Sequence, residues 1–166
     1  MTDSQSPESG DPFAEIGPYS NSDAPTVLAR LVRDAELADI IALWRLPWLT
    51  NAWPALSRQL GKLWLFLAAR RLQTVEDLQN LIAPNLSKMI KKTSQFSVSG
   101  IEQLDLKHAR LYLSNHRDIV MDPAYANYAL HRAGARTLAI AIGDNLLSKP
   151  WVADLMRLNK SFVVKR

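Results

Sequence analysis

Apolar side chains recur at a helical spacing through the first half of the chain. From residue 26 to residue 46 they fall at about every third or fourth position, which predicts an amphipathic helix that Pro47 should end or kink. A second helix is predicted over residues 53–72, and a third over residues 74–92 with a kink at Pro84. The first half of the chain is therefore expected to be helical.

After residue 94 the apolar positions gather into short runs. An alternating stretch at residues 95–99 and three continuous runs predict strands, with helices between the runs. The three runs predict strands at 109–114, 137–142 and 161–164. Helices are predicted between them, at 123–133 and 150–158. Because strands and helices alternate, we expect an α/β fold, with N-terminal helices followed by a mainly parallel sheet in βαβαβ order. The sheet is expected to be incomplete, because it stops at its third strand.

Charge divides the chain further. Residues 1–25 contain five acids, no Lys or Arg and four of the nine prolines, which predicts a disordered acidic tail. The remaining residues hold all 20 basic side chains and 11 of the 16 acids, so they favour an anionic partner: a phospholipid surface, a phosphorylated substrate or a nucleic acid. We expect three parts: the tail at 1–25, a helical, membrane-associating segment at 26–94, and a partial α/β domain at 95–166.

Composition excludes several kinds of site. The chain has no cysteine, which removes disulfides, thiolate zinc sites, iron–sulfur clusters and a cysteine nucleophile. The longest strongly apolar run covers residues 63–69, whereas a membrane-spanning helix needs about 20 residues. The acidic start also lacks the pattern of a secretory signal. Any membrane contact is therefore expected to be peripheral.

Polar clusters follow the three predicted buried strands, at residues 115–118, 143–145 and 165–166. The carboxyl ends of parallel strands meet at one edge of a sheet, and ligands bind beyond that edge. We therefore expect the functional site there, with the first cluster carrying the chemistry.

In the first cluster, His116 lies close in sequence to Asp118 and Asp122. Histidine titrates near neutrality, and a carboxylate on one ring nitrogen would raise the basicity of the other. The imidazole could then take a proton from a substrate hydroxyl. A structural interpretation competes with this one: the two acids would stabilise the start of the following helix through its dipole.

Two sequence blocks carry a family resemblance. SNHRDIVMDPAYANYAL resembles the first block of the glycerophospholipid acyltransferases, the glycerol-3-phosphate and 1-acylglycerol-3-phosphate acyltransferase superfamily, whose signature is N-H-x4-D after a buried strand. IGDNLLSKPWVADLMRLNKSFVVKR is similar to their second block, a strand, a polar turn, a proline-started helix and then G-x-x-F-I-x-R. The resemblance covers about residues 95–166, as the amino-terminal part of the family's domain.

The resemblance implies transfer of a fatty acyl group from acyl-CoA or acyl-ACP to a hydroxyl of glycerol-3-phosphate or lysophosphatidate, in phospholipid biosynthesis. His116 would be the general base, and Asp122 or Asp118 would orient it. Arg166 and Lys165 would hold the substrate phosphate, with Arg117 as a further candidate. No metal and no cofactor are expected, because the acyl thioester is a co-substrate.

Three departures from the family pattern stand out. In the family pattern four residues separate the histidine from the acid, which places the acid at position 121. That position is Met121, and Asp122 comes one position later, so we favour Asp122 as the partner. Lys160 replaces the glycine of the second block. The family's third block, E-G-x-R-S, and its fourth, proline-containing block are absent from the chain. This predicts a truncated or diverged form and leaves activity of the 166-residue chain open.

The predicted helix at 53–72 combines tryptophan and leucine on one broad face with Arg58, Lys62, Arg70 and Arg71. That pattern is typical of a helix lying in a membrane interface, and equally of a face packed on the first helix. We expect a cytoplasmic protein, peripheral on the inner face of the membrane. The expected partners are the acyl donor, the glycerol phosphate or lysophospholipid, and a membrane surface, with nucleic acid ranked last. The alternative function is a catalytically inactive membrane-surface or interaction module derived from the same fold.

Overall fold

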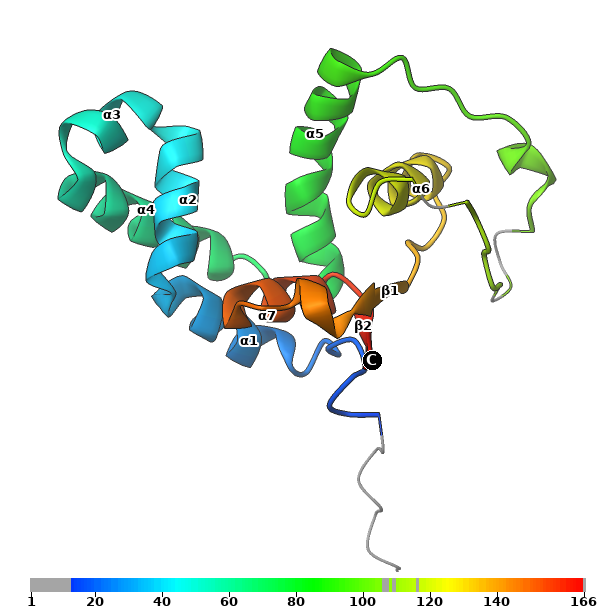
Figure 1. Cartoon of the computed structure of the whole chain (residues 1–166), viewed down its shortest axis with the longest axis horizontal. Helices are drawn as coiled ribbons and strands as arrows, with labels where there is room; N and C mark the ends of the chain where they lie inside the picture. Colours follow the sequence, from blue (N-terminus) through cyan, green and yellow to red (C-terminus); the bar gives the residue numbers. More distant parts are fainter. Residues whose placement is uncertain (1–12, 106–107, 109, 116, 166) are drawn as a thin grey trace, which may run out of the picture.

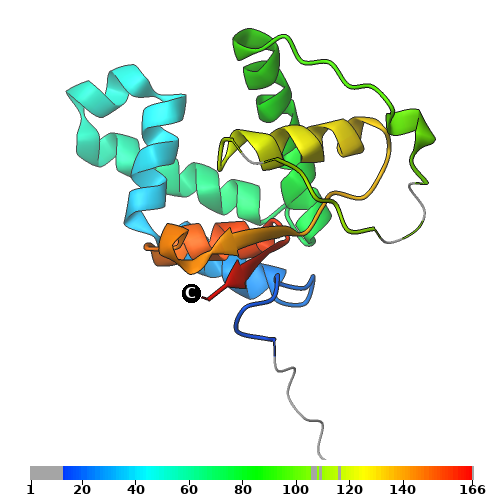
Figure 2. The same cartoon turned by 45° about the vertical axis from the view of Figure 1, so that its right-hand side comes forward.

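The computed structural model describes residues 13–105, 108, 110–115 and 117–165. Within these residues the protein is mostly helical, with one two-stranded parallel sheet (Figures 1 and 2). The helices are α1 (Ala24–Arg33), α2 (Ala35–Arg45), α3 (Pro47–Ala52), α4 (Pro54–Ala69), α5 (Val75–Thr93), α6 (Met121–Arg132) and α7 (Pro150–Leu158). The strands are β1 (Ile140–Gly143) and β2 (Ser161–Val164), and short 3₁₀ turns lie at Ile101–Gln103 and Asp144–Leu146.

The long helix predicted at 26–46 is broken in two. Asp34 has an extended backbone, and its carboxylate accepts the N–H of Leu37 at 2.9 Å, which caps the start of α2. Pro47 begins α3, as its fixed φ favours. The apolar residues keep their helical spacing across the break, because α1 and α2 each bury an apolar face. The spacing alone therefore does not reveal where one helix ends and the next begins.

Helices α2 and α4 form a hairpin closed by α3, and this hairpin projects away from the sheet (Figure 1). Its contact is close because of Gly61. A Cβ added there would lie 3.2 Å from the carbonyl carbon of Ala38 and 3.3 Å from the Cβ of Ala42. Glycine therefore lets the two backbones approach.

The predicted start of α5 at Thr74 is confirmed. Thr74 accepts the N–H of Asp77 at 3.1 Å, and Asp77 accepts the N–H of Thr74 at 2.8 Å, which completes a capping box. The helix continues through Pro84 to Thr93.

The parallel pairing expected at the carboxyl end of the chain is present. β1 pairs with β2 in the register Ile140↔Ser161 to Gly143↔Val164, and α7 makes the crossover between them. The βαβαβ order is not found among the described residues, because neither 95–99 nor 110–115 forms a strand. Leu111 and Leu113 are 85% and 88% exposed, and an extended segment becomes a strand only when a neighbour pairs with its backbone.

The main core lies where α1, α7 and the start of α5 meet. Leu158 is fully buried there among α1 and residues from Leu72 to Leu78. A smaller contact holds α6 against the end of α5: the ring of Phe96 stacks on Tyr125 with centroids 5.2 Å apart. Tyr128 adds a hydrogen bond to Ser87 at 3.0 Å.

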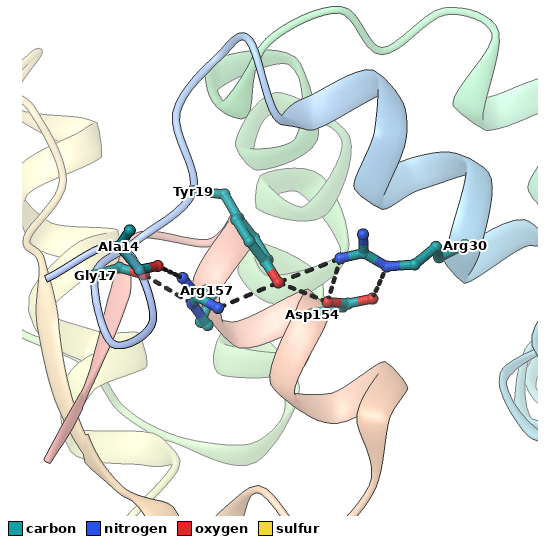
Figure 3. A network of polar contacts seen from close by, with 6 residues as sticks. All are labelled: Ala14, Gly17, Tyr19, Arg30, Asp154 and Arg157. Atoms are coloured by element: carbon teal, nitrogen blue, oxygen red, sulfur yellow. Dashed lines mark hydrogen bonds and ion pairs between the residues drawn. The ribbon is translucent and has the colours of Figure 1, made fainter. Parts of the chain in front are cut away.

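Residues 13–23 differ from the disordered tail expected over 1–25. Arg157 on α7 donates to the carbonyls of Gly17 at 2.7 Å and Ala14 at 2.6 Å (Figure 3). The N–H of Val163 donates to the carbonyl of Ile16 at 2.7 Å. Low hydrophobicity predicted disorder, but backbone hydrogen bonds to α7 and β2 hold this stretch in place. Residues 1–12 lie outside the described residues.

Candidate functional site

The first polar cluster lies at the start of α6. His116, the predicted base, and Arg166, the predicted phosphate ligand, lie outside the described residues. Arg117, Asp118 and Asp122 are described, and Arg117 and Asp118 are exposed. The geometry of the two acids therefore defines this part of the site.

Asp122 reaches back over the start of its own helix. Its Oδ2 accepts the N–H of Arg117 at 2.6 Å and the N–H of Asp118 at 2.8 Å. The first of these amides belongs to the peptide bond that joins residues 116 and 117. Asp122 is thus held within hydrogen-bond distance of the main chain that follows the predicted base.

Asp118 acts in the forward direction. Its Oδ1 accepts the N–H of Val120 at 2.9 Å and the N–H of Met121 at 2.7 Å. Both carboxylates therefore accept main-chain amides in the turn that leads into α6, a local structural role for the two acids. This role and catalysis are compatible, because a carboxylate accepts several hydrogen bonds and a held carboxylate can orient an imidazole.

The surroundings of the two acids are open and apolar. Ile119 and Val120 are more than half exposed, as are Leu111 and Leu113 a few residues earlier. Cavities of about 340 Å³ and 310 Å³ lie elsewhere, one between α1 and α7 and one between α2 and α4, and neither is lined by residues of this cluster.

The described residues of the second and third clusters follow two paired parallel strands. Gly143 pairs with Val164, so Asp144 and Lys165 continue from the same edge of the sheet. Asp144 begins a 3₁₀ turn, in which its carbonyl accepts the N–H of Leu147 at 3.0 Å. The Nζ of Lys165 is 3.1 Å from a carboxylate oxygen of Glu15, with both side chains mostly exposed. The first cluster is not carried to this edge by a strand, since 110–115 form none.

Lys160 has a role that the sequence indicated only as a departure from the family pattern. It adopts φ 63°, the left-handed region in which glycine is at ease. Its Nζ donates to Thr137 Oγ1 at 2.9 Å, and Thr137 donates to Gln79 at 2.9 Å. Burial, reinforced by the nearby charge of Arg136, lowers the pKa of Lys160. This residue links α5 to the sheet.

A second polar network was not predicted at all, because its members are far apart in the sequence. Arg30 binds Asp154 through two hydrogen bonds of 2.9 and 2.8 Å, and Tyr19 donates to the same carboxylate at 2.9 Å (Figure 3). Burial works against ionisation of Asp154, but the hydrogen bonds from Arg30 and Tyr19 outweigh it and lower its pKa. Burial, together with the hydrogen bond to Asp154, raises the pKa of Tyr19. The network joins residues 13–23 to α1 and α7.

Among the described residues, no group of three or more His, Asp or Glu side chains is arranged to hold a metal ion. Within the same residues, no helix is long and apolar enough to cross a membrane.

Residues 121–165 thus form a parallel α/β unit with polar residues beyond its strands, the place where α/β proteins bind ligands. Residues 95–166 match the protein-family model described as acyltransferase. The match confirms the resemblance read from the two sequence blocks, and it supports a general acyltransferase function. No curated protein and no solved structure matched the chain.

Proposed function

We propose that the protein transfers a fatty acyl group from acyl-CoA or acyl-ACP to a hydroxyl of glycerol-3-phosphate or lysophosphatidate, in phospholipid biosynthesis. The observation that carries the proposal is the position of Asp122, whose carboxylate accepts the amides of Arg117 and Asp118 directly after His116. The family match over residues 95–166 supports the same reaction class.

In the proposed reaction, His116 takes the proton of the acceptor hydroxyl while that oxygen attacks the thioester carbonyl. A carbon–oxygen bond forms, the carbon–sulfur bond breaks, and the proton passes from His116 to the departing thiolate. Asp122 orients the imidazole and stabilises its charged form. Asp118 is the second candidate for this task, because it lies in the same turn.

The phosphate of the acceptor would be bound by Arg166 and Lys165, with Arg117 as a further cation. Lys165 is exposed and follows β2, and its partner Glu15 lies on the surface, where an ion pair contributes little. A phosphate dianion could therefore displace Glu15. We propose a cytoplasmic protein, peripheral on the inner membrane face, with the thioester as co-substrate and no resident cofactor.

The alternative is a catalytically inactive membrane-surface or interaction module. The observation that favours it is that both acids already bind main-chain amides in the turn before α6 and at its first residue, while Lys165 pairs with Glu15. In that case the cluster would serve stability alone.

Thiol release from acyl-CoA in the presence of glycerol-3-phosphate or lysophosphatidate tests the proposal on the full-length protein. His116→Ala should lower kcat by about 100-fold or more. His131→Ala is the matched control, because His131 is exposed on α6 itself and should leave activity near the wild-type value. Wild-type protein that folds but releases no thiol with any of these acceptors would favour the inactive module.

Asp122→Asn and Asp118→Asn separate the two acids, because asparagine keeps an oxygen acceptor for the helix amides. The positioning residue should show a lower kcat with little change in KM, and the acid limb of its pH profile should move to lower pH, since the imidazole loses its anionic partner. We expect this behaviour from Asp122→Asn. If it appears only in Asp118→Asn, the assignment of Asp122 is wrong.

A further inference from the structure

The end of the α2–α4 hairpin carries large apolar side chains in contact with solvent. Trp44, Trp48 and Trp53 are 56%, 69% and 67% exposed, and Leu43 beside them is also exposed. These four residues, which we name the tryptophan tip, lie within α3 or directly before and after it, and α3 closes the hairpin at the end far from the sheet (Figures 1 and 2). Three tryptophans so exposed within ten residues are unfavourable in water.

An apolar stripe continues from the tip along α4. Its members follow the helical spacing of three and four residues, and all are exposed: Trp53, Leu56, Leu60, Leu63 and Leu67. A neighbouring side of α4 packs on α2, where Ser57 and Gly61 are buried. The leucines of the stripe are between one third and about one half exposed, so the helix presents an apolar side to solvent.

The charge around the tip and along α4 is mainly positive. Residues 40–75 contain five basic residues and no acid, together with four of the five tryptophans of the chain. Arg45 lies over the rings of Trp44 and Trp64, at 5.1 and 4.5 Å from their centroids. Arg58 pairs with Asp39, while the other four cations have no ion pair among the described residues.

We propose that the tryptophan tip and the α4 stripe bind the surface of an anionic phospholipid bilayer. Tryptophan favours the boundary between headgroups and acyl chains, leucine favours the acyl chains, and the cations would meet the anionic headgroups. The proposal rests on the peripheral membrane location proposed above and names the surface that would make the contact, but it does not depend on the acyl-transfer reaction or on His116.

The charge argues against two other occupants. A second copy of the chain related by a two-fold axis would place the basic region against itself, so like charges would face each other. A nucleic acid would match the charge, but the leucines of the stripe have no flat ring on which a base could stack. An anionic lipid surface offers acyl chains to the leucines and anionic headgroups to the cations.

Co-sedimentation of the full-length protein with vesicles tests the proposal. Vesicles of phosphatidylcholine and phosphatidylglycerol should bind the protein more tightly than vesicles of phosphatidylcholine alone, and high salt should weaken the binding. The double variant Trp48→Ala/Trp53→Ala should bind these vesicles at least about tenfold more weakly, because it lacks two indole rings that would be buried in the membrane interface. Circular dichroism checks that the variant folds.

A matched pair of charge variants separates a specific surface from net charge. Arg70→Glu/Arg71→Glu, which follow Leu67 at the end of the α4 stripe, should weaken binding to the anionic vesicles strongly. Lys91→Glu/Lys92→Glu changes the net charge equally at the exposed end of α5, away from both the tip and the α4 stripe, and should have a much smaller effect. Equal loss in the two variants would overturn the proposal.

Three further results would also overturn it. One is a full-length protein that does not bind anionic vesicles, which would mean that another part of the protein covers the tip. The second is unchanged vesicle binding by the tryptophan variant together with a shift from dimer to monomer in sedimentation equilibrium. The third is tighter binding to a polynucleotide than to vesicles at physiological salt, lost in the tryptophan variant. The two proposals can fail separately. If His116→Ala had no effect on acyl transfer, the catalytic proposal would be wrong, but the vesicle-binding results would still test the membrane surface.

Discussion

Gly61→Ala is the sharpest test of the packing between α2 and α4, because two physical effects oppose each other there. In the interior of a helix, alanine is favoured over glycine by about 1 kcal/mol. The methyl group added at Gly61, however, would press on the backbone carbonyl of Ala38 and lie 3.3 Å from the Cβ of Ala42. The contact with Ala38 involves main-chain atoms, so no side-chain rotation can relieve it.

The magnitude follows from the shift required. The added methyl carbon would overlap the carbonyl oxygen of Ala38, so the two helices must separate by about 1 Å to restore an ordinary contact. Overpacking of this kind costs about 1–3 kcal/mol, and the backbone contact places Gly61 near the upper end. After the gain in helix propensity is subtracted, we expect the free energy of unfolding to fall by about 2 kcal/mol.

Urea unfolding followed by circular dichroism measures this change. Alanine and glycine placed in turn at Gln59, an exposed position of the same helix, provide the propensity difference without the packing contact. At Gln59 the alanine variant should be the more stable, and at Gly61 the glycine. Greater stability of Gly61→Ala than of the wild type would refute the close α2–α4 contact.

Other predictions concern the cap, the polar network and the catalytic pair. Thr74→Ala removes the capping box of α5 and should lower the free energy of unfolding by about 1 kcal/mol, whereas Thr93→Ala at the exposed end of that helix should change it little. The folded pKa of Asp154 lies below its ordinary value, so its contribution to stability is complete at neutral pH and is lost as the pH falls below about 4. Acid titration of unfolding should therefore be shallower in Asp154→Asn than in the wild type, and parallel curves would contradict the network. Asp122→Asn should shift the pH profile of acyl transfer as described above.

The elements that could be predicted are those with a local signal. Thr74 with its following acids predicted the start of α5, and Pro150 and the run at 161–164 predicted α7 and β2 within a residue. The break at Asp34 was missed because the apolar spacing continues across it. The strand at 109–114 was predicted from hydrophobicity, which measures a preference for burial and not the presence of a neighbouring strand.

The candidate site divides in the same way. His116, Asp118 and Asp122 were found from residue type and spacing, but the two amides that hold Asp122 depend on how the chain turns into α6. The network of Tyr19, Arg30 and Asp154 has no signal in sequence, because residues more than a hundred positions apart meet only when α1 and α7 pack.

The hydrogen bond from Val163 to Ile16 decides in which direction the sheet can be extended. β2 has β1 along one side, and at Val163 its other side is occupied by the carbonyl of Ile16. An added strand would therefore have to pair with β1, because reaching β2 would first require residues 13–17 to detach from α7. Residues 13–17 thus cover the free edge of β2 and protect it from pairing with strands of other chains.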